Sequence, residues 1–419
     1  MSEDWIAVFE ALKGVYGDGG FSNITISEAV SHHRGCRGSF VRSFAKGVIR
    51  DTMRLDFIIG ELAEKGLKGI KTRPLIILRM GIYAIESLDS VPEYAAVNEA
   101  VSLARKVSKG TDRFINAVLR SYIRKADEIK IPENPELKYS IPEPVFNLLA
   151  RQYGDETDEI ADALNTAPPL ILRANTIKNT RAELIKSLKN VGFEASAVPE
   201  SEIAVKASGE GITGTDLYRG GYFTIQSLSS IKAIEAFSPE KGEKILDLCA
   251  APGGKSTAIA EMMSDSGEIT ACDIYEHRLE LINASAARLG LGSIKTCLND
   301  ASVHIPEWDE LYDKVLADVP CSGLGTARSK PEIKYRIDAE NLRELEDLQL
   351  SILKNAYSYV KPGGILEYST CTLNKDENEE IVLKLLKDTA SAAFVEMRTI
   401  LPYNDWTGFY YCIIRKNAY

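Results

Sequence analysis

The sequence predicts an α/β protein, in which a C-terminal domain with a parallel sheet follows an all-helical domain and a small mixed unit. Three observations lead to this fold class. Apolar residues recur at helical spacing throughout residues 1–130. Four prolines crowd residues 132–144, and proline discourages a continuing helix. From residue 222 onward, strand-like runs alternate with helical stretches, which is typical of a parallel sheet covered by helices.

The N-terminal 130 residues predict a helical core. Pro74 can open a helix, because proline lacks the N–H that a first helical turn leaves unpaired. Gly110 ends one apolar stripe, and Thr111 can cap the helix that follows. The apolar positions of the stripes, which we expect to be buried, are Trp5, Val8, Phe9, Leu12, Leu75, Leu78, Ile82, Val97, Val101, Ala104, Val107, Phe114, Val118, Leu119 and Tyr122.

The middle of the chain, residues 131–221, predicts a small α+β unit. Its strand is expected at Leu170–Ala174 and its capped helix at Thr180–Gly192. The remaining residues, 222–419, then form the α/β domain. Its strands are expected at 244–248, 268–273, 294–298, 314–319 and 365–369, and its helices include 275–289 and 338–360.

Composition excludes several classes of protein. The acidic start has no basic and apolar leader, and the longest apolar run, Leu75 to Ile85, is interrupted by Arg79 and is too short to span a bilayer. The seven cysteines are odd in number and form no Cys-x-x-Cys, and the four histidines form no ligand cluster. We therefore expect a cytoplasmic protein without disulfides, metal or membrane contact, and nothing demands more than a monomer.

Charge is unevenly distributed along the chain. The net charge is −10, yet residues 1–130 carry 20 basic and 16 acidic residues. The stretch from Ser31 to Arg50 holds five basic residues and no acid. This stretch is either a phosphate-binding face for nucleic acid or a solvated helix surface.

A glycine-containing loop follows the first strand of the α/β domain, at Asp247–Thr257. A triphosphate-binding loop would need glycine where Cys249 stands, and the glycine pattern of a dinucleotide site is absent. Small residues before a helix N-terminus still allow a ligand to approach the backbone closely. The loop residues predicted to bind a cofactor are Cys249, Ala250, Ala251, Pro252, Gly253, Gly254 and Lys255.

Three aspartates follow successive strands of this domain. Asp273 is placed to accept hydrogen bonds from ribose hydroxyls, Asp300 is placed to meet an adenine edge, and Asp318 ends the fourth strand. Each alone could be a helix cap. Together, behind a loop without a phosphate cradle, they favour a ribose-containing ligand that lacks phosphates, and S-adenosylmethionine fits this description.

Two cysteines follow neighbouring strands, Cys321 after the fourth and Cys371 after the fifth. We expect both thiols in one cleft and the remaining cysteines at 36, 272, 297 and 412 to be inert and buried. A thiolate that adds to C6 of cytosine makes C5 nucleophilic enough to take a methyl group. A helix N-terminus near Asn374 could lower the pKa of the Cys371 thiol. Asp318 could bind the base edge, and the target base must leave its stack.

At these residues the chain resembles the RsmB/Sun (Fmu) branch of the RsmB/NSUN family of RNA cytosine-C5 methyltransferases. The matching blocks are DLCAAPGGKST (247–257), DVPCSG (318–323), KPEIKY (330–335), YSTCTLNKDEN (368–378) and GFYY (408–411). The resemblance implies a Rossmann-like class I methyltransferase domain that binds S-adenosylmethionine. It also implies that Cys371 is the nucleophile, that Cys321 assists product release and that Asp318 faces both cofactor and base.

The N-terminal part resembles NusB, an all-helical RNA-binding fold, at residues 78–83, 91–101 and 114–120. A NusB-like domain before such a catalytic domain is the layout of the family branch that acts on 16S ribosomal RNA, either naked or within an assembling small subunit. Two alternatives stay open at this point. One is the same chemistry on transfer RNA, and the other is a non-catalytic RNA-binding protein of the antitermination type.

Overall fold

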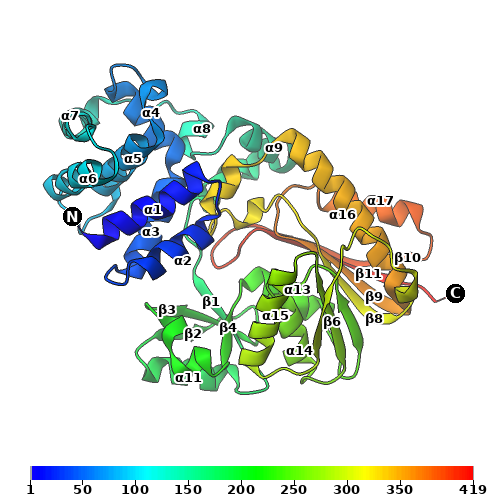
Figure 1. Cartoon of the computed structure of the whole chain (residues 1–419). Helices are drawn as coiled ribbons and strands as arrows, with labels where there is room; N and C mark the ends of the chain where they lie inside the picture. The colour runs from blue at the N-terminus through cyan, green and yellow to red at the C-terminus, as the bar shows by residue number, and fades with distance from the viewer. Residues whose placement is uncertain (1, 419) are drawn as a thin grey trace. The chain divides into compact units, whose positions relative to one another are not determined.

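The computed structural model describes residues 2–418, which form two compact units (Figure 1). One unit runs to Asn165 and also includes Ala327–Arg336, and the other comprises Thr166–Thr326 and continues from Ile337. The first unit is helical, and the second carries both β-sheets. Within residues 2–418, no helix combines the length and the apolar character that crossing a membrane requires.

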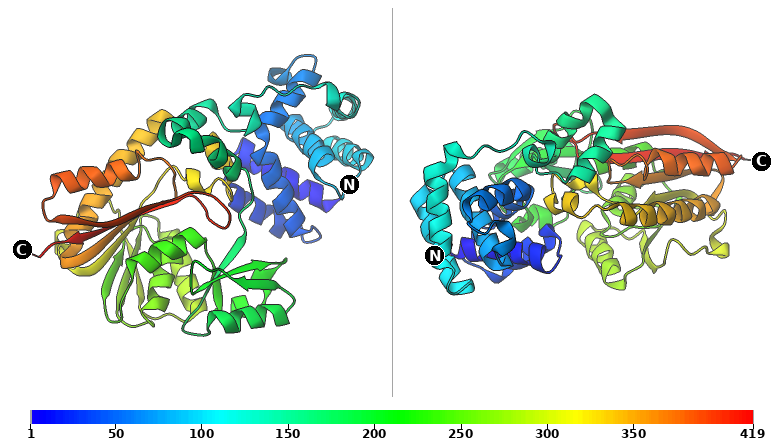
Figure 2. Two further views of the ribbon diagram at one scale, coloured as in Figure 1. Left: turned by 180° about the vertical axis from the view of Figure 1, so that it is seen from behind. Right: turned by 90° about the horizontal axis from the view of Figure 1, so that it is seen from above.

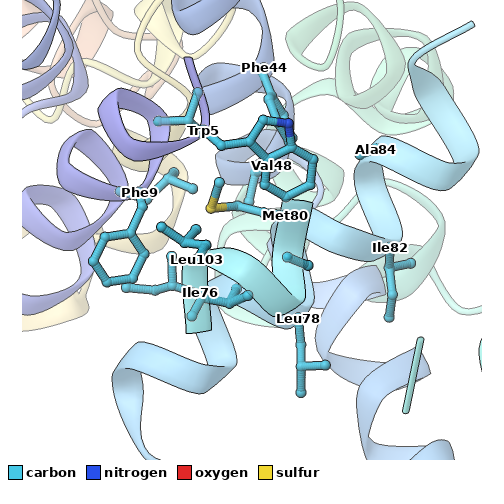
Figure 3. Packing of buried hydrophobic residues seen from close by; sticks show 14 of the residues in the cluster. Trp5, Phe9, Phe44, Val48, Ile76, Leu78, Met80, Ile82, Ala84 and Leu103 are labelled. Carbon is cyan, nitrogen blue, oxygen red and sulfur yellow. The ribbon is translucent and has the colours of Figure 1, made fainter. Parts of the chain in front are cut away.

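The first unit is helical, which confirms the prediction, and its helices within residues 3–125 pack around one core (Figure 3). Of the expected core positions, Leu75, Val101 and Val107 are only half-buried, and Phe114 has 37% of its surface exposed. It lies one residue, about 100° of helix rotation, from the buried Ile115. The helices of this unit are α1 (Glu3–Gly17), α2 (Ser22–His32), α3 (Gly38–Arg50), α4 (Thr52–Leu62), α5 (Thr72–Ser87), α6 (Glu93–Val107), α7 (Asp112–Lys125), α8 (Pro135–Lys138), α9 (Glu143–Tyr153) and α10 (Thr157–Leu164).

The segment Ala327–Arg336 belongs to this helical unit although it lies far along the chain. Its Lys334 is buried and donates hydrogen bonds to the carbonyl of Arg50 at 2.8 Å and to Oδ1 of Asn165 at 2.7 Å. Burial lowers the pKa of Lys334 well below its usual value. The spacing of apolar residues along the sequence did not predict this placement, because the contacts join residues more than 160 positions apart.

Replacing Lys334 by methionine is expected to destabilise the helical unit by roughly 2 kcal/mol, because Oδ1 of Asn165 loses the Lys334 donor and the Arg50 carbonyl keeps only the Tyr335 hydroxyl of its two donors. Methionine fills a similar volume, so the loss reports hydrogen bonding rather than a cavity. Thermal unfolding measures the effect, with Lys13→Met on the exposed face of α1 as the control. An equal melting temperature in the two variants would contradict the structural role of Lys334.

The second unit begins with a four-stranded antiparallel sheet in the order β2-β3-β1-β4. The predicted strand and capped helix are both present: Thr180 and Glu183 form a reciprocal capping box at the start of α11. The elements are β1 (Leu170–Ala174), α11 (Arg181–Asn190), β2 (Glu194–Ala197), β3 (Ala204–Ser208), α12 (Asp216–Arg219) and β4 (Phe223–Ile225).

This unit also contains a seven-stranded sheet in the order β10-β11-β9-β8-β5-β6-β7. Figure 2 shows the ribbon of the sheet from two further sides. Its strands from β9 to β7 are parallel, and β11 is antiparallel to both β9 and β10. The strands are β5 (Lys244–Asp247), β6 (Glu268–Asp273), β7 (Ile294–Leu298), β8 (Tyr312–Asp318), β9 (Val360–Thr370), β10 (Ala392–Ile400) and β11 (Phe409–Lys416).

Helices cover both faces of this sheet, which confirms the predicted α/β class. One core contains residues of α13, α14 and α15, and the core on the other face contains residues of α16 and α17. The helices are α13 (Leu228–Phe237), α14 (Gly254–Met262), α15 (Glu276–Leu289), α16 (Ala339–Tyr359) and α17 (Glu379–Asp388). The divisions expected at residues 130 and 221 stay predictions.

Candidate active site

The candidate residues gather where the central parallel strands end. The strands β6, β5, β8 and β9 are neighbours in the sheet, so their carboxyl ends share one edge. The glycine loop follows β5, Asp273 ends β6, Asp318 ends β8 and Cys371 follows β9. The positions of these residues at strand ends were therefore enough to predict that they lie at one edge of the sheet.

The loop between β5 and α14 is held tightly at both ends. The N–H of Ala250 donates to the carbonyl of Cys272 at 2.7 Å, and the side chain of Ser256 donates to Asp247 at 2.6 Å. Gly253 has a φ of 99°, a conformation that L side chains rarely adopt, and a Cβ there would lie 3.2 Å from Cα of Ile282. The first turn of α14 thus begins at a backbone that only glycine accommodates easily, and it leaves unpaired N–H groups for a ligand.

Asp273 and Asp300 lie beside this loop in different settings. Asp273 is buried and accepts hydrogen bonds from the N–H of Tyr275 at 3.1 Å and from Arg278 at 3.3 Å. Asp300 accepts from the N–H and hydroxyl of Ser302, so one of its oxygens is engaged within its own turn. The residue before it, Asn299, donates its N–H to the carbonyl of Asp273 at 3.1 Å, which links the two strand ends.

The polar groups here fit a ligand with a ribose and an adenine. The side-chain nitrogen of Asn299 is buried without a hydrogen-bond partner beside Asp273. Ile274, which follows β6, and Leu298, which ends β7, expose 51% and 59% of their surfaces. Unpaired polar atoms beside exposed apolar side chains are suited to binding a nucleoside.

Lys255 and Asp318 form an ion pair that sequence reasoning did not predict. Nζ of Lys255 lies 2.5 Å from Oδ2 of Asp318, and the hydroxyl of Ser369 donates to Oδ1 at 3.1 Å. Burial opposes the charge of Lys255, but the Asp318 carboxylate outweighs it and raises the lysine pKa. The side chain of Asp318 remains 29% exposed, so it is fixed in position and still accessible to a ligand.

Two further carboxyl groups, Asp247 and Glu367, are buried close to this pair. Burial raises the pKa of Asp247 to about 7 and that of Glu367 well above its ordinary value, and the charge of Asp318 adds to both shifts. Lys255 is the cation that opposes both shifts. Burial therefore favours the protonated form of Glu367, and Asp247 titrates near neutral pH.

Replacing Asp247 by asparagine is expected to remove a pH dependence of stability. Because the folded-state pKa of Asp247 lies above its unfolded value of 3.8, the native protein binds this proton more tightly than the unfolded chain does. The stability that this contributes is present at low pH and is lost as pH rises through about 7, on the order of 1.4 kcal/mol per pH unit.

Thermal unfolding from pH 5 to pH 8 measures the difference between the native protein and Asp247→Asn. The native protein is expected to lose stability relative to the variant as pH rises. Ser256→Ala, which removes only the hydroxyl partner of Asp247, serves as the control because it keeps the carboxyl group. Parallel pH profiles for the native protein and Asp247→Asn would contradict the shifted titration.

The two thiols expected in one cleft are adjacent. Sγ of Cys321 and Sγ of Cys371 lie 3.3 Å apart, which is hydrogen-bonding distance for sulfur and longer than a disulfide bond of about 2.05 Å. The hydrogen bond to Cys371, together with burial, raises the pKa of Cys321 well above its ordinary value. Cys321 therefore keeps its proton and can donate it toward the Cys371 sulfur.

Two expectations about the cysteines and their surroundings were wrong. Cys272 and Cys412 are buried as expected, but Cys36 and Cys297 are half-buried, because they lie in a loop and on the edge strand β7. The helix expected near Asn374 begins only at Glu379. Residues 374–378 instead form turns that carry the buried Glu377 between the two cysteine loops.

Glu377 is a further functional candidate that sequence reasoning missed. Its carboxylate accepts hydrogen bonds from residues that directly follow both cysteines. The signal available in the sequence was only its place in the block that follows Cys371. Among residues 2–418, no group of three or more His, Cys, Asp or Glu side chains is arranged to hold a metal ion.

Three protein families match successive parts of the chain. The NusB family matches residues 7–124, and a ferredoxin-like domain of RsmF/B-like methyltransferases matches residues 141–210. The family described as 16S rRNA methyltransferase RsmB/F matches residues 234–409, which include the glycine loop and both cysteines.

Curated relatives are similar over most of the chain. A probable ribosomal RNA small subunit methyltransferase B from Bacillus subtilis (strain 168) is 35% identical over 398 residues, covering 89% of each chain. A ribosomal RNA small subunit methyltransferase B from Vibrio vulnificus is 32% identical, covering 98% of this chain and 99% of the relative.

Solved structures share the fold. A methyltransferase homologue from Pyrococcus horikoshii is 28% identical with a TM-score of 0.61, covering 67% of this chain and 97% of its own. The crystal structure of PH0851, 24% identical, covers 99% of both chains with a TM-score of 0.86. NSun6 from Pyrococcus horikoshii, solved with SFG, is 20% identical with a TM-score of 0.60, covering 66% of this chain and 98% of its own.

Proposed function

The chain belongs to the RsmB/F family of ribosomal RNA methyltransferases, and from this premise we propose that it methylates C5 of a cytosine in 16S ribosomal RNA through a transient bond between Cys371 and C6. It is an S-adenosylmethionine-dependent RNA methyltransferase. The observation that carries the proposed mechanism is the pair of thiols 3.3 Å apart at the ends of β8 and β9, beside the Lys255–Asp318 pair.

S-adenosylmethionine supplies an electrophilic methyl group on a sulfonium centre. The loop after β5 is proposed to contact it through the backbone at the start of α14, where glycine permits a close approach. Asp273 is proposed to accept from the ribose hydroxyls and Asp300 to bind the adenine edge. The proposed contacts are Cys249, Ala250, Ala251, Pro252, Gly253, Gly254, Lys255, Asp273, Asp300 and Asp318.

Cys371 is the proposed nucleophile. Its sulfur bonds to C6 of the cytosine, which raises the electron density at C5 so that C5 can accept the methyl group. A base then takes the C5 proton, the electrons of the C5–H bond re-form the C5–C6 double bond, and the S–C6 bond breaks so that the Cys371 thiolate is restored. A protonated Cys321 at 3.3 Å can stabilise the Cys371 thiolate by donating a hydrogen bond, both before addition and after release.

Asp318 is proposed to position the base. Lys255 and Ser369 hold its two carboxylate oxygens, so the side chain is fixed before the substrate arrives. Its exposed portion can meet the N3/N4 edge of a cytosine that has left its stack. Cys321 is proposed to assist product release.

We further propose that the protein acts as a monomer in the cytoplasm, on naked 16S ribosomal RNA or on an assembling small subunit. The relatives named for the small ribosomal subunit support this substrate. The helical domain similar to NusB supports RNA binding by the N-terminal part.

Methyl transfer by the purified protein tests the substrate. Unmodified 16S ribosomal RNA and unmodified transfer RNA are each incubated with S-adenosylmethionine carrying a labelled methyl group, and 5-methylcytosine is mapped by sequencing. We expect one methylated cytosine in 16S ribosomal RNA and none in transfer RNA. The reverse pattern would assign the same chemistry to transfer RNA, and no labelled RNA at all would favour a non-catalytic RNA-binding protein.

A further inference from the structure

Glu377 is a buried carboxylate that joins the two cysteine loops. One of its oxygens accepts hydrogen bonds from the N–H of Ser322 at 2.8 Å and from Gln349 at 3.0 Å. The other accepts from the hydroxyl of Ser322 at 2.5 Å, from Asn374 at 3.1 Å and from the hydroxyl of Thr372 at 3.4 Å. The residue has no solvent-exposed surface.

The partners of Glu377 stand directly beside the thiols. Ser322 follows Cys321, and Thr372 follows Cys371. The hydroxyls of Ser322 and Thr372 also lie 2.7 Å apart, which adds a direct link between the two loops. The carboxylate of Glu377 therefore links the two loops that carry Cys321 and Cys371.

Gln349 extends this tie to the helix α16. Its side-chain nitrogen donates to Glu377 and to the carbonyl of Pro320, the residue before Cys321, at 2.9 Å. Because a helix is more rigid than a loop, this contact anchors the Cys321 loop to the sheet's helical layer. Hydrogen bonds to a charged acceptor are stronger and shorter than neutral ones, so a carboxylate suits this position.

We propose that Glu377 is a positioning residue that fixes the separation of the two thiols and thereby couples addition by Cys371 to release through Cys321. This inference rests on the proposed function of the cysteines. Reacting groups lose roughly 100-fold in rate when they are misplaced by about 1 Å, so a loosened tie between the loops is expected to have a large effect.

The variant Glu377→Gln keeps the size of the side chain but puts an amide that donates where a carboxylate oxygen accepts. Because the N–H and the hydroxyl of Ser322 donate to different oxygens of Glu377, one of these two groups faces a donor in either orientation of the amide. Two readouts are measured. Rapid mixing with RNA gives the rates of adduct formation and adduct decay. Diamide, which removes two hydrogens from a pair of thiols, gives the rate of disulfide formation between Cys321 and Cys371 without RNA or cofactor.

We expect adduct decay to slow about 100-fold in Glu377→Gln while the affinity for S-adenosylmethionine stays unchanged. Disulfide formation is expected to slow about 10-fold, since the thiols no longer stay together. Glu380→Gln, the same substitution at an exposed position of α17, is the matched control. If Glu377→Gln does not fold, Ser322→Ala is used in its place. This variant removes one hydroxyl that donates to Glu377, and we expect the same changes in rate, but smaller ones.

The two readouts separate this inference from the proposed function. If Glu377→Gln forms the disulfide more slowly but the native protein methylates no RNA, the result would support the role of Glu377 in holding the two loops together and would refute the proposed function. Rates of decay and of disulfide formation equal to those of Glu380→Gln would overturn the positioning role. The positioning role would also be overturned by a third result. In that result Glu377→Gln binds the cofactor more weakly and melts at a lower temperature, while the ratio of its rates of adduct formation and decay is unaltered.

Discussion

Cys371→Ala is expected to abolish methyl transfer, by about 10³-fold or more, and to abolish covalent capture of RNA that contains 5-fluorocytosine. The alanine removes the atom that bonds to C6, and C5 of an unactivated cytosine is a poor nucleophile. Cys321 is not expected to replace it, because burial, which persists after the hydrogen bond to Cys371 is lost, still raises the pKa of Cys321 and favours the protonated thiol. Label transfer and denaturing gels measure the two losses.

Cys36→Ala is the matched control for this prediction, since Cys36 lies in the helical unit and outside the proposed site. It is expected to retain both activities. Binding of S-adenosylmethionine and the melting temperature should be similar in Cys371→Ala and the native protein. Normal turnover by Cys371→Ala would refute its assignment as the nucleophile.

Cys321→Ala is expected to accumulate a covalent complex between protein and unmodified RNA. Only the Cys371 sulfur bonds to C6, and Cys321 assists that addition by a hydrogen bond alone, but release is proposed to need the neighbouring thiol that lies 3.3 Å away. General acid and base groups contribute about 10²–10⁴-fold, so we expect adduct decay to slow by at least about 100-fold. A band of higher mass on a denaturing gel, sensitive to ribonuclease, measures the trapped complex.

The double variant Cys321→Ala with Cys371→Ala separates this result from non-specific cross-linking, because it should form no complex. Cys36→Ala should release RNA as the native protein does. If Cys321→Ala yields only free protein while RNA is methylated at the native rate, Cys321 has no part in release.

Much of the arrangement at the edge of the sheet where the candidate residues lie could be predicted from the sequence alone. Parallel strands place their carboxyl ends together, so Asp273, Asp318 and Cys371 could be assigned to one edge from strand positions. The adjacency of β8 and β9 then predicted that both thiols meet, and the Sγ–Sγ distance of 3.3 Å confirms this contact. The pattern and types of residues in the sequence were sufficient for this prediction, because they identify each strand and show at which of its ends a residue lies.

Side-chain partners could not be predicted in the same way. The Lys255–Asp318 pair and the Glu377 contacts depend on rotamers and loop paths that no periodicity encodes. The helix expected near Asn374 was wrong because hydrogen bonds to buried side chains outcompeted a helical turn there. The position of Lys334 in the helical unit depends on contacts between distant segments, which local patterns do not reveal.

Mass spectrometry of the trapped complex tests the central claim most directly. The native protein is incubated with S-adenosylmethionine and 16S ribosomal RNA in which cytosine is replaced by 5-fluorocytosine, whose C5 fluorine cannot leave as a proton does. After digestion with protease and ribonuclease, we predict that the peptide containing Cys371 carries one methylated fluorocytidine nucleotide. A nucleotide on the peptide containing Cys321, or no modified peptide while native RNA is methylated, would contradict the account.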